Sequence, residues 1–201
     1  MLIITALAIE AESLIAALQA EEECRLEGKS RLYRGGAHDI LVCGPGKERA
    51  EGCLCAYLKT RRPELIVNAG GAGILDPALQ TGQVYTISEV CLENTDKCLL
   101  LPPLSGLPVL RCVSAEKAVS DVQRRERIFR KTAAGIVDME CLFLARIAAK
   151  QTIPFSALKV TSDFADATLE ADFRKHIREG MKLLTDCLLQ GSGMIKPSQI
   201  I

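Results

Sequence analysis

Residues 136–166 read IVDMECLFLARIAAKQTIPFSALKVTSDFAD, and this stretch decides the fold. Its middle part places apolar residues at the spacing of an amphipathic helix. After Pro154, the mostly apolar run 155–160 is typical of a buried strand that ends at Thr161. A helix followed by such a strand indicates an α/β sheet with helices over both of its faces.

Two acidic clusters bracket this stretch. Glu140 lies at the start of the helix, and Asp163 follows the strand. Ligands of open α/β sheets bind beyond the carboxyl ends of strands, so both acids are candidates for one pocket. The alternative is a local role, because acids in a first helical turn interact with the helix dipole and an Asp after a strand caps a turn. The stretch alone leaves both interpretations open.

Strands and helices alternate along the rest of the chain. We expect further strands at 2–8, 31–33, 39–43, 65–68, 83–89, 109–113 and 135–137, and helices at 12–18, 47–60, 115–131 and 170–190. Ser114 is the expected cap of the helix at 115–131. The pattern predicts a single domain over residues 1–190 and a loose tail over 191–201.

The composition excludes several classes of partner. The 25 basic and 25 acidic residues cancel, so the chain as a whole has no electrostatic attraction to nucleic acid or to an anionic membrane. Trp is absent and aromatic residues make up only 4%, which leaves little for base stacking along a nucleic acid strand. No apolar run reaches the roughly 18–20 residues that a membrane span needs.

The nine cysteines predict neither a disulfide framework nor a metal site. Their number is odd, no pair has CxxC spacing, and no secretory leader precedes them. We therefore expect reduced thiols in a cytoplasmic protein without bound metal.

A glycine cluster, Ala69-Gly70-Gly71-Ala72-Gly73, follows the strand expected at 65–68. It matches neither GxxxxGK[ST] nor GxGxxG, which argues against a phosphate loop and a dinucleotide-binding oxidoreductase. One interpretation is a tight turn where the backbone must approach something closely. We favour the other, in which the backbone of Gly70 and Gly71 lines a pocket.

Four separated segments resemble one family, the nucleoside phosphorylase and nucleosidase superfamily. They are ALAIEAES at 6–13, CGPGKERA at 43–50, IVNAGGAGILDPALQTGQVYTISEV at 66–90, and VDMEC at 137–141 together with TSDFAD at 161–166. The resemblance is greatest to methylthioadenosine/S-adenosylhomocysteine nucleosidases, and the details DPALQTG, SAEKA and VDME look most like a hopanoid-associated branch. It implies a three-layer α/β/α sandwich around a mixed, twisted sheet, and cleavage of the N-glycosidic bond of a purine nucleoside, with a 5′-substituted adenosine favoured.

The resemblance also assigns roles to single residues. Glu12 matches the carboxylate that activates the attacking water, and Asp163 the acid that protonates or hydrogen-bonds purine N7. Glu140 matches the acid that binds the ribose 2′- and 3′-hydroxyls, and Met139 the residue that packs on the ribose. Ser162 precedes the N7 acid and is expected to contact substrate. Such residues suit the reaction, because the base leaves with a proton while the sugar gains positive charge.

Departures from the family pattern keep alternatives open. Gly71 stands where relatives carry a hydroxyl, and the segment SAEKA at 114–118 lacks their stacking Phe, for which Phe164 or Phe155 are possible replacements. The phosphate-binding arginines of the phosphorylases are missing too. Their possible substitutes are Lys47, Arg49 and Arg111.

These departures leave water as the expected nucleophile, because Glu12 would repel phosphate. The alternatives are a phosphorylase that uses inorganic phosphate as co-substrate and a nucleoside-binding module without catalysis. The resemblance implies no cofactor and a homo-oligomer, with a dimer favoured.

Overall fold

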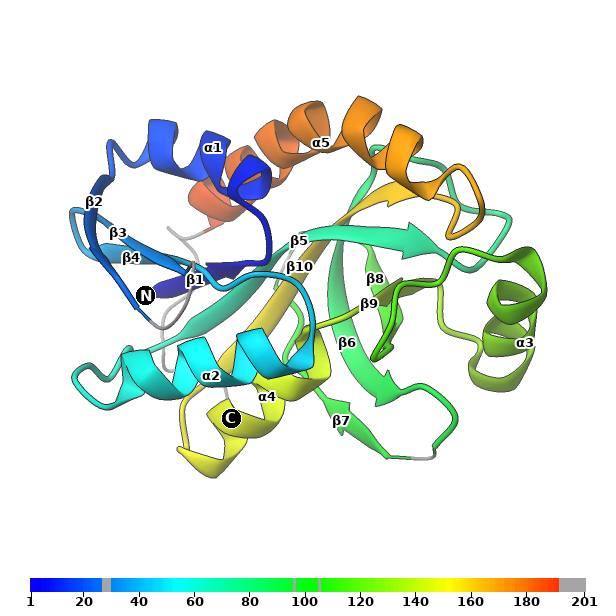
Figure 1. The fold of residues 1–201 in the computed structure, drawn as a ribbon, viewed down its shortest axis with the longest axis horizontal. Helices are drawn as coiled ribbons and strands as arrows, with labels where there is room; N and C mark the ends of the chain where they lie inside the picture. The colour runs from blue at the N-terminus through cyan, green and yellow to red at the C-terminus, as the bar shows by residue number, and fades with distance from the viewer. Residues whose placement is uncertain (27–29, 96, 105, 192–201) are drawn as a thin grey trace.

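The computed structural model describes residues 1–26, 30–95, 97–104 and 106–191, which form a ten-stranded mixed sheet with helices on both faces (Figure 1). The strands are β1 (Leu2–Thr5), β2 (Glu21–Arg25), β3 (Arg31–Gly35), β4 (His38–Val42), β5 (Ile66–Ile74), β6 (Val84–Leu92), β7 (Cys98–Leu100), β8 (Val109–Ser114), β9 (Ile136–Asp138) and β10 (Phe155–Asp163). The helices are α1 (Ala8–Ala17), α2 (Lys47–Leu58), α3 (Val122–Thr132), α4 (Cys141–Lys150) and α5 (Leu169–Gly191).

The sheet is mixed because parallel and antiparallel pairs share the same central strands. β4, β1, β5 and β10 run parallel, whereas β6 is antiparallel to β10 and β9 is antiparallel to β5. β10, β6, β8, β9 and β5 form a closed circuit of strand pairings. The parallel strands therefore end at one edge, where a ligand site is expected.

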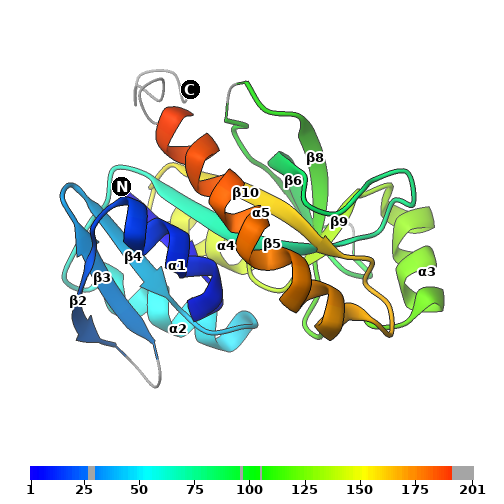
Figure 2. The ribbon, with the colours of Figure 1, turned by 90° about the horizontal axis from the view of Figure 1, so that it is seen from above.

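Two pairs of helices cover the sheet. α1 and α5 lie together on one face, and α2 and α4 on the other (Figures 1 and 2). Each pair of helices contributes side chains to its own buried cluster. Leu14 of α1 packs in one cluster with Ile177 and Leu184 of α5, and Leu54 of α2 packs in the other with Leu142 of α4. Full burial of such a side chain contributes about 1.5–3 kcal/mol. The predicted three-layer α/β/α fold is confirmed.

The first helix begins earlier than predicted. β1 ends at Thr5, and α1 starts at Ala8 instead of Glu12. The amides of Ala6 and Leu7 donate to the carboxylate of Glu10, which thereby satisfies free backbone donors at the start of the helix. This early start puts Glu10 in the first turn and turns Glu12 to the outside.

The glycine cluster is part of a strand, which rules out the alternative of a tight turn. β5 continues through Gly70 and Gly71 to Ile74, and these glycines pair with Lys159 and Val160 of β10. Pairing with β10, and the hydrogen bond from the amide of Gly71 to Glu10, outweigh the low strand propensity of glycine because they satisfy buried backbone groups.

The predicted cap of the third helix is also wrong. α3 begins at Val122, where the Asp121 carboxylate accepts the amide of Arg124 at 2.8 Å. Ser114 instead donates its hydroxyl to Asp138 at 2.6 Å and accepts the amide of Leu142 at 3.0 Å. Two strands, β2 and β7, lie in segments where we predicted none.

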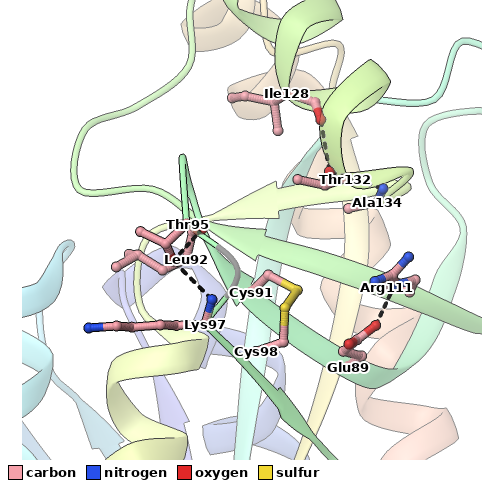
Figure 3. The surroundings of a disulfide bond; sticks show 10 residues. All are labelled: Glu89, Cys91, Leu92, Thr95, Lys97, Cys98, Arg111, Ile128, Thr132 and Ala134. Atoms are coloured by element: carbon pink, nitrogen blue, oxygen red, sulfur yellow. Dashed lines mark hydrogen bonds and ion pairs between the residues drawn. A yellow bond between two sulfur atoms is a disulfide. The ribbon is translucent and has the colours of Figure 1, made fainter.

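One pair of cysteines contradicts the prediction that every thiol is reduced. Cys91 on β6 and Cys98 on β7 form a disulfide across the hairpin (Figure 3). The two residues are direct cross-strand partners, which brings their sulfur atoms together. Glu89 lies beside them, but its carboxylate pairs with Arg111, and sulfur atoms bonded to each other are not free metal ligands. The other seven cysteines form no disulfide.

The remaining expectations concern the C-terminal tail and the membrane. α5 continues to Gly191, and the rest of the predicted tail, 192–201, lies outside the described residues. Within the described part of the chain, no helix is both long and apolar enough to cross a membrane.

Candidate active site

A cavity of about 620 Å³ lies where β1, β5 and β10 end. Its volume is within the range of about 300–1,000 Å³ that is typical of small-molecule sites. The lining residues come from the ends of three strands, from the turn after β4, from the segment before α3, from the β9–α4 junction and from the start of α5. Those that carry carboxylates are Glu10, Asp138, Glu140, Asp163 and Glu170.

Glu10 is held rigidly at the floor of the cavity and is only 3% exposed. Its Oε2 accepts the amides of Ala6 at 3.0 Å and Leu7 at 2.8 Å, and its Oε1 accepts the amide of Gly71 at 2.8 Å. Burial raises the pKa of Glu10, and these three hydrogen bonds oppose the rise. The three donors fix the direction of the carboxylate, which leaves acceptor capacity for a ligand.

Glu140 connects the second half of the chain to the turn after β4. It lies just before α4, and its Oε1 accepts the amide of Gly46 at 2.6 Å. Burial, followed by repulsion from Asp138, raises the pKa of Glu140 to about 7. The charge of this carboxyl therefore changes near neutral pH.

Asp163 enters the cavity from the end of β10. Its Oδ2 accepts the hydroxyl of Ser162 at 2.7 Å, and its Oδ1 accepts the amide of Ala165 at 2.9 Å. Burial raises the pKa of Asp163, while these two hydrogen bonds lower it. The net rise favours a protonated acid that can donate into the cavity.

A buried ion pair lies next to the acids. Lys159 on β10 is 1% exposed, and its Nζ is 2.7 Å from Oδ2 of Asp138. Burial alone would lower the pKa of Lys159, but Asp138 and neighbouring groups raise it, so the ammonium keeps its charge. That charge lowers the pKa values of Glu10 and Glu140 and partly offsets the cost of burying them.

Glu12 does not reach the cavity, so the structure contradicts its predicted place in the site. Its side chain is 55% exposed, and its Oε2 accepts Nε of Arg178 on α5 at 3.1 Å. It lines a separate depression between α1 and α5. Glu10 precedes it by two residues, which is about half a helical turn and therefore the opposite side of α1.

The other predicted site residues lie at or beneath the cavity. Met139, Gly71 and Ser162 line it together with Glu140 and Asp163. Gly70 does not line it and instead supports Glu10, since a Cβ on Gly70 would be 2.9 Å from Oε1 of that carboxylate.

Sequence reasoning missed the aromatic side chain that lines the cavity. Phe173 on α5 lines it, whereas Phe155 is buried in the core and Phe164 does not line it. A Cβ on Gly71 would be 2.9 Å from Cε2 of Phe173, so the glycine creates the space that the ring occupies. Phe173 lies far along the chain from the other motifs, and helix periodicity alone does not show which residue of α5 faces the cavity.

The cationic residues considered as phosphate ligands lie elsewhere. Nζ of Lys47 lies 3.8 Å from Oε1 of Glu116, and Arg111 forms an ion pair with Glu89. Arg49 lines a neighbouring cavity. Among the described residues that line the acid cavity, the one cationic side chain is the exposed Arg174.

A sequence comparison adds to the evidence of the fold. Residues 107–190 match the sequence profile of the phosphorylase superfamily. This match bears out the predicted resemblance to the nucleoside phosphorylase and nucleosidase superfamily, and the mixed sheet with its helices agrees with it.

Particular relatives fall within one part of that superfamily. The chain is 22% identical to 5′-methylthioadenosine/S-adenosylhomocysteine nucleosidase of Staphylococcus haemolyticus over 76% of this chain and 81% of that protein. The fold is similar to the Helicobacter pylori 5′-methylthioadenosine/S-adenosylhomocysteine nucleosidase, with TM-score 0.85, 15% identity and coverage of 96% and 97%. It is also similar to the futalosine hydrolase of Helicobacter pylori, with TM-score 0.84, 15% identity and the same coverage.

Proposed function

We propose that this protein hydrolyses the N-glycosidic bond of a purine nucleoside, with a 5′-substituted adenosine as the preferred substrate. The observation that carries the proposal is the convergence of Glu10, Glu140 and Asp163, from three separate elements, on one cavity of about 620 Å³. Three carboxyls held in different hydrogen-bonding environments suit three different tasks in one reaction.

Asp163 acts on the leaving base. Burial raises its pKa above that of a free Asp, which favours the protonated carboxyl that donates to N7 of the purine as the bond to the sugar breaks. The donor makes the base a better leaving group, since the electron pair of the glycosidic bond moves onto the base.

Glu10, and not Glu12, orients and deprotonates the attacking water. Its carboxylate is fixed by the amides of Ala6, Leu7 and Gly71, and its negative charge stabilises the positive charge that develops on the ribose. Glu140 accepts hydrogen bonds from the ribose hydroxyls, and Met139 packs on the sugar.

Water is the proposed nucleophile because the cavity is acidic. With Asp163 protonated and Asp138 paired with Lys159, the lining still holds the carboxyls of Glu10, Glu140 and Glu170 against one exposed arginine among the described residues. A phosphate ion would therefore meet net negative charge. The proposal therefore includes no cofactor and no phosphate requirement.

The 5′ substituent would lie against apolar side chains. Ile9, Leu169 and Phe173 line the cavity and offer a surface for an apolar 5′ group. The names of the relatives support this assignment, since methylthioadenosine and S-adenosylhomocysteine both carry 5′ substituents.

The test is release of free adenine from adenosine, methylthioadenosine and a bulky 5′-substituted adenosine, each with and without phosphate. We expect release without phosphate, and loss of release in Asp163→Asn while adenine still binds. Asp186→Asn, the same change at an exposed position, is the matched control. Release only with phosphate would favour a phosphorylase, and binding without any release would favour a non-catalytic module.

A cytoplasmic location and a homodimer complete the proposal. The seven cysteines that form no disulfide support a reducing compartment, and the Cys91–Cys98 bond argues against it. Cell fractionation and sedimentation of the purified protein test these two points.

A further inference from the structure

The loop that carries Asp163 adopts a strained conformation. We call residues 163–168 the acid loop. Ala165 has φ +50°, in the left-handed region that costs a residue with a Cβ about 1–2 kcal/mol. This conformation brings the amide of Ala165 to within 2.9 Å of Oδ1 of Asp163. The direction of the Asp163 carboxyl therefore depends on the backbone of residues 164–165, and that backbone must be held by its surroundings.

Arg125 of α3 holds this backbone from outside the loop. Its Nη1 donates to the carbonyl oxygen of Phe164 at 3.0 Å and lies 3.6 Å from Oδ2 of Asp166. The side chain is 19% exposed, so solvent screens these contacts less than it screens those of a fully exposed arginine. Asp166 in turn accepts the amide of Thr168 at 2.9 Å, which closes the far end of the loop.

The opposite flank of Asp163 has a different support. Nδ1 of His176 on α5 lies 3.3 Å from the carbonyl oxygen of Ser162. The backbone carbonyls before and after Asp163 are thus each contacted by a side chain from a different helix. Of these two contacts, the one from α3 lies on the strained segment that contains Ala165.

We propose that Arg125 is a positioning residue that aligns Asp163 with the leaving base, an inference that rests on the proposed function. Arg125 does not line the cavity, so it acts through the acid loop and not on substrate. Both contacts come from one nitrogen, Nη1, so the charged end of this long side chain contacts a carbonyl and a carboxylate of the acid loop together.

The expected cost of losing this support follows from catalytic geometry. Misplacement of a reacting group by about 1 Å lowers the rate by about a hundredfold. Arg125→Met keeps an unbranched apolar stem and removes the guanidinium, and we expect kcat to fall by about tenfold to a hundredfold. The KM should change by less than about threefold, because the ribose site at Glu140 lies on other elements. Arg125→Lys should give an intermediate kcat.

The experiment compares base release by wild type, Arg125→Met, Arg125→Lys and the control Arg127→Met, an exposed arginine on the same helix. Thermal unfolding identifies which variants are folded, and Arg125→Lys serves if Arg125→Met is not. Adenine binding is then measured for Arg125→Met in the wild-type and Asp163→Asn backgrounds. We expect weaker binding in the first background and no further effect in the second, since coupled residues are not additive.

Each outcome bears on one of the two proposals. Wild type that releases no base would refute the proposed function, and the inference with it. Active wild type, with a folded Arg125 variant that keeps full kcat, would refute the inference alone. Equal weakening of adenine binding in both backgrounds would also refute it, because Arg125 would then act independently of Asp163.

Discussion

Replacing Glu140 with Gln should stabilise the protein increasingly as the pH rises. Gln has nearly the same shape, and its carbonyl oxygen can still accept the amide of Gly46. It removes a carboxyl that ionises unfavourably in the cavity, beside Asp138. The proposed ribose ligand is therefore a source of instability in the substrate-free protein.

The magnitude follows from the pKa of Glu140. Burial and Asp138 raise this pKa from 4.5 to about 7. At about 1.4 kcal/mol for each pKa unit, the charged form is disfavoured in the folded protein by about 3 kcal/mol. The folded pKa is above the unfolded one, so the stability associated with Glu140 is fully present below pH 4.5 and lost as the pH rises through about 7. Glu140→Gln lacks this carboxyl and does not lose that stability. The difference in free energy of unfolding between the variant and wild type should therefore grow from near zero at pH 4 to about 3 kcal/mol at pH 8.

Urea unfolding of both proteins at pH 5, 6, 7 and 8, at constant ionic strength, measures this difference. Glu64→Gln, the same change at an exposed position, is the matched control. A difference between wild type and Glu140→Gln that does not change over this range would refute the assigned pKa and its cause. A fall in urea m-value would instead indicate a change in the unfolding transition itself.

Three further predictions test the site and its support. Glu10→Gln should lower the rate of base release by at least about a hundredfold, whereas Glu12→Gln should stay within about twofold of wild type. The reverse order would contradict the assignment of Glu10 as the acid that activates water. Lys159→Met should lower the free energy of unfolding by about 3–5 kcal/mol, because it leaves a buried carboxylate unpaired, and denaturant titration that finds no loss would contradict the ion pair. The double variant Cys91→Ser, Cys98→Ser should lower the free energy of unfolding by about 2 kcal/mol, since the disulfide closes a short loop. If the double variant unfolds at the same temperature as oxidised wild type, the bond is contradicted.

Local pattern was sufficient for most of the fold. Apolar residues at strand or helix spacing predicted the strands on either side of the glycine segment and the helix that follows Glu140. Elements buried in an α/β sheet place their apolar residues at these spacings. The boundaries were less accurate. α1 began early because Glu10 satisfies the amides of Ala6 and Leu7, a contact between a side chain and backbone that periodicity does not reveal.

The sequence by itself determined the three-layer α/β architecture and two of the three acids, Glu140 and Asp163, since each lies next to an element with a clear period. Only the tertiary structure decided which N-terminal acid enters the cavity. Glu10 and Glu12 are the same residue type, two positions apart, and they lie on opposite sides of α1. The choice depends on where β1 ends and on the approach of Gly71 from β5, so it is set by contacts between segments far apart in the chain.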